Sequence, residues 1–148
     1  MNTVEGPAAA SQADRAELAD LVARQGLWLD EGDFANAGAI FTSDAVVRTQ
    51  GGESRGLDAL TAQARRVHQS YGATQHVTSN VLIEIDGDRA SLRANLIAVF
   101  VAASAAPRPA VMIGERYRFE ARRTPAGWRL SAVEAEPVWR DGEPAGKN

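Results

Sequence analysis

The side chains best suited to proton transfer lie in the stretch Thr74-Gln75-His76-Val77-Thr78-Ser79-Asn80, which holds one of only two histidines in the chain. Histidine is the side chain whose charge ordinarily changes near neutral pH. The stretch continues into Val81-Leu82-Ile83-Glu84-Ile85, and a period of two predicts a strand. That period puts His76, Thr78 and Asn80 on one face, and Val77, Val81, Ile83 and Ile85 on the other. The pattern predicts a short file of polar side chains that leads into an apolar core.

Composition limits the classes of protein to consider. A chain of 148 residues is long enough to bury the core of one domain. Its net charge of -3 gives no electrostatic reason to expect nucleic acid or an anionic membrane as a partner. The absence of cysteine excludes disulfides and thiolate chemistry and is compatible with a reducing cytoplasm.

Hydropathy gives no sign of a membrane segment. No apolar run approaches the ~20 residues that span a bilayer, and Met1 to Ala10 lacks the pattern of a signal peptide. We therefore expect a cytoplasmic protein with a single domain over residues 11–141 and flexible tails at 1–10 and 142–148.

The first half of the chain has helical spacing. Ser11 and Asp14 resemble a capping box with Asp in place of Glu, and they predict a helix that begins near Ser11. Its apolar stripe consists of Leu18, Leu21, Val22, Gln25, Trp28 and Leu29. Gly32 predicts the end of this helix, and Asp33 caps a second, short helix carrying Phe34, Ala37, Ile40 and Phe41. A short strand over 44–49 and a third helix over about 54–70 follow.

After Gly72 the period changes from 3.6 to 2. Four long strands are predicted at Thr74 to Ile85, Arg89 to Val101, Ala110 to Arg123, and Trp128 to Trp139. Helices followed by a meander of long antiparallel strands are typical of an α+β fold, in which a curved sheet carries its helices on one face. Such a sheet encloses a cone that is suited to a small-molecule pocket.

Several motifs occur together in a characteristic order: Leu29-Asp30-Glu31-Gly32-Asp33-Phe34, Ile40-Phe41-Thr42-Ser43-Asp44-Ala45-Val46-Val47, Thr74-Gln75-His76, Ile85-Asp86-Gly87-Asp88-Arg89-Ala90, Gly127-Trp128-Arg129-Leu130 and Pro137-Val138-Trp139. In this order the chain resembles the SnoaL-like branch of the nuclear-transport-factor-2-like (NTF2-like) superfamily, which includes scytalone dehydratase, ketosteroid isomerase and limonene epoxide hydrolase. The resemblance implies an NTF2-like cone of three N-terminal helices packed against a curved, mainly antiparallel sheet.

The resemblance also implies a catalytic pair. Asp30 stands where scytalone dehydratase has an active-site aspartate, and His76 is similar to one of its catalytic histidines. Asp30 would fix the tautomer of His76 and leave the other ring nitrogen to exchange protons with a substrate. Alternatively, Asp30 is a solvated residue of an acidic helix end, and His76 is a structural histidine.

Departures from these enzymes argue against some of their mechanisms. The tyrosine expected before the aspartate is Leu29, which puts a strict scytalone-type dehydration in doubt. A base for ketosteroid isomerase chemistry is missing, because the positions in question are Arg48 and Thr49. The Arg-x-Asp pair of limonene epoxide hydrolase is matched by Arg93-Ala94-Asn95, and an Asn amide is no general base.

Other side chains are candidates for substrate binding. Arg93 or Asn95 would bind a substrate oxygen, or else face solvent, and Tyr117 would donate its phenol, or else belong to the core. Glu134 and Glu136 could supply a second acid or form an exposed rim. The expected substrate-binding residues are Trp28, Phe41, Tyr71, Asn80, Arg93, Asn95 and Tyr117. No phosphate loop, Gly-x-Ser-x-Gly elbow or His-x-x-x-His pair is present, so we expect no cofactor and no metal.

Three functions remain open. The first is an acid/base enzyme without a cofactor, a cyclase, isomerase or dehydratase for a small, apolar, oxygenated molecule; the family resemblance implies a polyketide-like secondary metabolite. The second is an epoxide-opening cyclase or hydrolase, and the third is a non-catalytic domain for small-molecule binding or dimerisation. Apolar residues on both faces of the long strands, such as Leu96 and Ile97, predict a homodimer, and the family resemblance implies that it forms through the outer face of the sheet.

Overall fold

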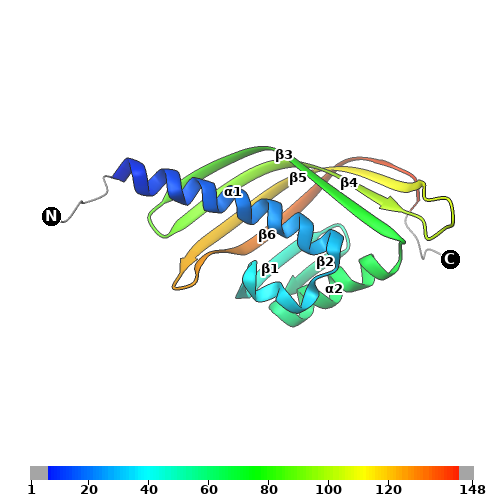
Figure 1. The fold of residues 1–148 in the computed structure, drawn as a ribbon, viewed down its shortest axis with the longest axis horizontal. Helices are drawn as coiled ribbons and strands as arrows, with labels where there is room; N and C mark the ends of the chain where they lie inside the picture. The colour runs from blue at the N-terminus through cyan, green and yellow to red at the C-terminus, as the bar shows by residue number, and fades with distance from the viewer. Residues whose placement is uncertain (1–6, 144–148) are drawn as a thin grey trace.

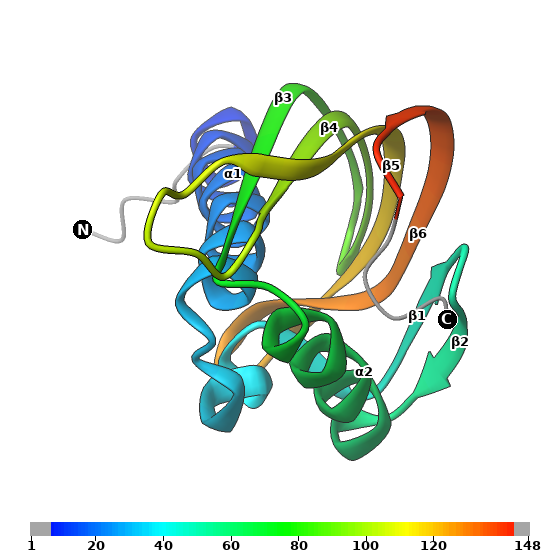
Figure 2. The same cartoon turned by 90° about the vertical axis from the view of Figure 1, so that its right-hand side faces the viewer.

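The structure is a computed structural model that describes residues 7–143. Helix α1 (Pro7–Glu31) packs along the outermost strand β3 (Ala73–Asp86) of a curved sheet, as Figure 1 shows. Seen end-on, the long strands form an arch, with α1 on one side and helix α2 (Leu57–Gln69) across the open side (Figure 2). The α+β class predicted from the sequence is confirmed.

The described sheet has six strands in the order β2-β1-β6-β5-β4-β3. The long strands β3, β4 (Arg89–Val101), β5 (Pro109–Thr124) and β6 (Gly127–Asp141) form an antiparallel meander, within one or two residues of the predicted bounds. Strand β1 (Phe41–Thr49) runs parallel to β6 and antiparallel to β2 (Gly52–Arg55). The sheet is therefore mixed but mainly antiparallel.

The predicted set of three helices needs correction. Helix α1 begins at Pro7, four residues before the predicted start, so Ser11 is no N-cap; residues 1–6 and 144–148 of the predicted tails lie outside the described chain. The second helix is a 3-10 helix, η1 (Phe34–Ala39), and Phe41 already belongs to β1. The third begins at Leu57, because residues 54 and 55 pair with β1 in strand β2.

Helix α1 ends where the sequence predicts. Gly32 has φ 66°, in the left-handed region that glycine adopts without a Cβ clash. A Cβ at Gly32 would also lie 3.1 Å from the His68 ring. This glycine therefore stops α1 directly after Glu31 and lets α2 approach the end of α1.

The core lies between α1 and the concave face of the sheet. Alternate residues of β4 and β5 point inward, which follows from the period of two. The most deeply buried large side chains are Trp128, Phe119, Leu18, Leu92, Leu130, Val22 and Val111. Burial of each such side chain stabilises the fold by about 1.5–3 kcal/mol. This packing fixes where the C-terminal end of α1 meets β3.

The predicted faces of β3 are wrong after Ser79. The pairing with β4 shifts between Ser79 and Leu82, and Asn80 has φ 56°, so a β-bulge exchanges the two faces there. Val77 is 48% exposed on the outer face, whereas Val81, Ile83 and Ile85 pack toward the core on the inner face that His76 shares.

Candidate active site

Asp30 and His76, 46 residues apart in the sequence, are joined by hydrogen bonds. Asp30 lies in the last turn of α1, and His76 lies on the adjacent strand β3. The Nδ1 atom of His76 is 2.6 Å from Oδ1 of Asp30, and its backbone N–H donates to Oδ2 at 2.9 Å. Thr74 Oγ1 donates a third hydrogen bond to Oδ1 at 3.0 Å. These three contacts hold the carboxylate and the imidazole in one orientation.

The contacts also fix the protonation of the pair. Burial works to raise the pKa of Asp30, but the hydrogen bonds from His76 and Thr74 outweigh it, so this pKa lies below its ordinary value. An ionised carboxylate only accepts hydrogen bonds, so Nδ1 of a neutral His76 carries the proton. The lone pair of Nε2 is then available to take a proton from another molecule.

A cavity of about 780 Å³ lies against His76. Its wall combines residues of α1, α2 and all six strands, and it is rich in aromatic side chains. Phe100 meets the His76 ring edge-on at 6.0 Å, and Tyr71 lies 5.0 Å from Phe100. Trp28 packs edge-on against Phe41 at 5.2 Å. The cavity volume falls in the range of small-molecule sites.

A second carboxyl group, that of Glu115 on β5, faces the same cavity. Burial raises the pKa of Glu115, although the charges of His76 and Arg140 act in the opposite direction. The two acids of the site therefore differ, because three donors lower the pKa of Asp30 while burial raises that of Glu115.

Two cavity-lining side chains carry buried polar atoms that have no hydrogen-bond partner among the described residues, Gln25 Oε1 and Trp28 Nε1. Both residues are 5% exposed, and they lie one turn apart on α1. Tyr117, opposite them on β5, is buried, which raises its pKa, while a hydrogen bond with Gln25 works to lower it. Unpaired polar atoms are uncommon in buried positions. Two of the three found among the described residues lie beside this cavity, and the third, Arg122 Nε, lies at a different hollow.

Comparison with known proteins identifies the family. The model of the SnoaL-like domain matches residues 10–134. This chain belongs to the SnoaL-like domain family. The resemblance drawn from the motifs is therefore confirmed. Among curated proteins no match is found.

Solved structures share the fold of this SnoaL-like domain. An NTF2-like protein with a cystatin-like fold from Novosphingobium aromaticivorans is 26% identical, with a TM-score of 0.71 over 97% of this chain and 94% of the other. A hexachlorocyclohexane dehydrochlorinase, LinA type 2, is 21% identical, with a TM-score of 0.79 over 92% of each chain. A structure from N. aromaticivorans named provisionally as a scytalone dehydratase is 16% identical, with a TM-score of 0.78 over 93% and 97%. The last two likenesses describe the fold alone.

The SnoaL-like fold brings together most of the side chains that the sequence singled out. Four of the seven expected substrate-binding residues line the cavity with His76, namely Trp28, Phe41, Tyr71 and Tyr117. Asp30 stands behind His76 and contacts it directly. Their joint role in binding or catalysis remains a prediction.

The other three expected substrate-binding residues do not line this cavity, so its geometry does not support the role predicted for them. Asn80 is exposed in the β-bulge of β3. Arg93 and Asn95 are exposed on the outer face of β4, because they alternate with the buried residues Leu92, Ala94 and Leu96. Glu134 and Glu136 are also exposed, on β6.

Many residues of this cavity were not predicted as site residues, and three polar ones among them matter for its chemistry: Gln25, Glu115 and Arg140. Gln25 was assigned to the apolar stripe of the first helix. Glu115 lies two residues before Tyr117 on the same strand, so the period of two placed both on one face. That pattern alone could not show that this face lines a cavity. Arg140 falls one residue beyond the predicted end of the last strand.

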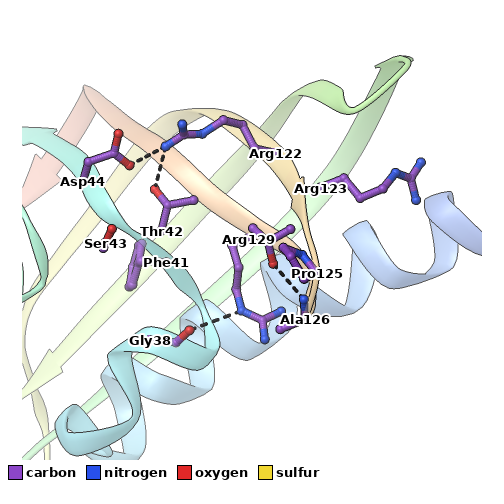
Figure 3. A pocket seen from close by; sticks show the side chains of 11 residues that line it. Gly38, Phe41, Thr42, Ser43, Asp44, Arg122, Arg123, Pro125, Ala126 and Arg129 are labelled. Carbon is purple, nitrogen blue, oxygen red and sulfur yellow. Dashed lines mark hydrogen bonds and ion pairs between the residues drawn. The ribbon is translucent and has the colours of Figure 1, made fainter.

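A second, shallower hollow of about 540 Å³ lies beside the turn between β5 and β6. Figure 3 shows two of its arginines bonded to neighbouring groups: Arg122 donates to Thr42 and Asp44, and Arg129 donates to the carbonyl of Gly38. Arg123 forms ion pairs with Asp14 and Asp88. This hollow holds no histidine, and its charged groups already serve the fold.

Neither a metal site nor a membrane span is found in the part of the chain that the structure describes. Residues 7–143 contain no group of three or more histidines and acidic residues placed to hold a metal ion. No helix in this range has both the length and the apolar character needed to cross a bilayer.

Proposed function

We propose that this protein is an acid/base enzyme in which the Asp30–His76 pair removes a proton from a small, oxygenated, mostly apolar substrate. The observation that carries the proposal is the set of three hydrogen bonds to Asp30, which orient His76 beside a 780 Å³ cavity. Positioned general bases typically contribute about 10²–10⁴ in rate.

The reaction begins with loss of a proton from a carbon next to a carbonyl. Nε2 of His76 takes that proton, and Asp30 stabilises the imidazolium that forms. Cyclisation, isomerisation and dehydration all use this step. The aromatic wall formed by Trp28, Phe41 and Phe100 favours a planar or ring-containing substrate, such as a polyketide-like secondary metabolite. The proposed chemistry needs no cofactor.

Two other functions fit the site less well. An epoxide-opening enzyme was expected to use polar residues of β4, and Arg93 and Asn95 lie on the face away from the cavity. A non-catalytic binding domain would use the same cavity, but it would not need a histidine held by three contacts to one carboxylate.

Exchange of the C–H protons of a model ketone with deuterium tests the proposal without knowledge of the native substrate. The probe is 1-tetralone in D₂O, and NMR follows loss of the protons next to its carbonyl. We expect the wild-type protein to accelerate exchange and His76→Ala to remove most of the acceleration, with Asn95→Ala on the outer face as the control. Wild-type exchange no faster than in buffer, or an unchanged rate in His76→Ala, would contradict the proposed enzyme.

We further propose that the protein forms a homodimer through the outer face of the sheet. Val77, Ile97 and Trp139 lie in one cross-strand row there and are 48%, 43% and 44% exposed. The Trp139 indole covers Gly114, where a Cβ would meet it at 2.1 Å. Exposed apolar rows of this kind mark interfaces. Light scattering should give a dimeric mass, and Ile97→Glu should give a monomer; a monomeric wild type counts against the interface.

A further inference from the structure

Glu115 lies on the same concave face as His76, two strands away. His76, Ala98, Ile113 and Arg140 form one cross-strand row over β3, β4, β5 and β6. The next row of that face contains Thr78, Leu96, Glu115 and Pro137. Neighbouring strands are about 4.8 Å apart, so the backbones that carry His76 and Glu115 are separated by about two strand spacings across the sheet. Both residues line the cavity.

The carboxyl of Glu115 has no local partner. Within residues 7–143 it forms no hydrogen bond and no ion pair, and its interactions are with the more distant charges of His76 and Arg140. Asp30, by contrast, accepts three hydrogen bonds. Partial burial without donors disfavours the ionised form of Glu115, and the protonated carboxyl can donate a hydrogen bond to a ligand.

We propose that Glu115 is a second catalytic residue, the acid that protonates an oxygen atom of the substrate while His76 acts as the base. This inference rests on the proposed function. It points to a substrate with a hydroxyl group on the carbon next to the one that loses its proton. A hydroxyl group leaves more readily as water when an acid protonates it, so an acid across the cavity from His76 would speed the loss of this group.

The step balances within the site. Nε2 of His76 takes the proton, and the electron pair of the broken C–H bond forms a C=C bond. The C–O bond breaks, and the oxygen leaves with its bonding electrons and the proton of Glu115 as water. His76 is then an imidazolium and Glu115 a carboxylate, with Arg140 at the end of the His76 row to offset the new negative charge. Return of the proton from His76 to Glu115 through water restores the enzyme.

The test separates the two proton transfers. The probe is 4-hydroxy-4-phenylbutan-2-one, in which exchange of the proton next to the carbonyl reports His76 and formation of the enone reports departure of the hydroxyl. Glu115→Gln should keep exchange within about threefold of wild type and lower enone formation about 10²-fold or more. Glu136→Gln, an exposed carboxyl on β6, is the matched control and should change neither rate.

The pH profile gives a second readout. Enone formation by the wild type should fall on the alkaline side as Glu115 loses its proton, and Glu115→Asp should keep such a limb while Glu115→Gln loses it. The other charged or titratable side chains on the cavity wall are His76 from β3, Tyr117 from β5, Arg140 from β6, Glu53 from β2, Arg66 and His68 from α2, and Tyr71 from the segment between α2 and β3. Glu115→Gln isolates the contribution of one carboxyl among them.

Each result has one meaning. Equal loss of exchange and enone formation in Glu115→Gln, or no loss of either, overturns the role of Glu115 and leaves the His76 base intact. Unchanged exchange in His76→Ala, or a wild type that neither exchanges nor dehydrates the probe, contradicts the proposed function itself and the role of Glu115 with it.

Discussion

Helix α1 carries one aspartate near each end, and each accepts three hydrogen bonds. Asp14 accepts from Arg123 Nη1 and Nη2 at 2.7 and 2.8 Å and from Trp128 Nε1 at 3.1 Å. Asp30 accepts from the side chain and backbone of His76 and from Thr74. Two similar carboxylates thus have different surroundings, and the partner decides what each can do.

The partner of Asp14 does not titrate in the physiological range. Arg123 keeps its charge, and its guanidinium also lies 4.6 Å from the ring of Trp128, so this end of α1 is fastened to the hairpin between β5 and β6. The partner of Asp30 is a histidine beside a cavity, whose proton can leave or arrive. The hydrogen-bonded pair at Asp30 is a candidate site, unlike the one at Asp14, because Nε2 of His76 faces a cavity and can exchange a proton with a ligand.

The tryptophans at the two ends show the same difference. Trp128 is 1% exposed and its indole N–H is bonded to Asp14, whereas the equally enclosed N–H of Trp28 has no partner among the described residues. Packing satisfies polar groups where only stability is at stake. Near the cavity, a bound ligand could supply the hydrogen bonds that Trp28 Nε1 and Gln25 Oε1 lack.

The largest expected effect is the loss of turnover in variants of the Asp30–His76 pair. His76→Ala should lower turnover by about 10²–10⁴, because it removes the general base. Asp30→Asn should also lower it, since the amide leaves the imidazole in the wrong tautomer. The two losses should not add in the double variant, because both residues serve one proton transfer. Steady-state rates alongside circular dichroism melts check this, and a folded, fully active His76→Ala would refute the mechanism.

The next effect is on stability at the Asp14 end. Asp14→Asn should lower the free energy of unfolding by about 1.5–3 kcal/mol, because it weakens two bonds from a guanidinium and one from a buried indole. Turnover per folded molecule should not change. Urea denaturation measures the loss, with Asp20→Asn, an exposed aspartate of the same helix, as the control. An equal loss of unfolding free energy in both variants would contradict the structural role of Asp14.

A smaller effect concerns acid pH. The hydrogen bonds from Arg123 and Trp128 lower the pKa of Asp14 from 3.8 to about 2. Because this pKa is lowered in the folded state, the stability it contributes is present above pH 3.8 and is lost as the pH falls toward 2. Asp14→Asn should therefore flatten the acid limb of a stability profile measured by urea denaturation across this window. If the acid limb of Asp14→Asn is as steep as that of the wild type, other groups cause the loss of stability at acid pH.

The smallest expected effect is spectroscopic. An aromatic ketone bound in the cavity should quench part of the tryptophan fluorescence, because Trp28 lines the cavity whereas Trp128 and Trp139 do not. Trp28→Phe should remove the quenching, and Trp139→Phe should leave it. A titration with 1-tetralone measures both. Quenching that survives in Trp28→Phe would place the ligand outside this cavity.

Local pattern alone was sufficient for much of the fold. The period of two predicted β3 to β6 within two residues, because strands buried on one face must alternate. Gly32 marked the end of α1, since its left-handed conformation is a property of the residue itself. The short strand β2 was missed, because its residues Gly52–Arg55 acquire strand structure only by pairing with β1.

For the candidate site too, the sequence predicted one part and the tertiary structure decided the other. The sequence determined that a carboxylate stands at the end of a helix and an imidazole on a strand, and the family resemblance paired them. Only the packing of α1 along β3 brought Asp30 to His76, because contacts across 46 residues depend on how whole elements pack. The bulge at Asn80 and the environment of Glu115 were likewise decided by tertiary structure. Strand register and burial are set by neighbours distant in the chain, and no local period records them.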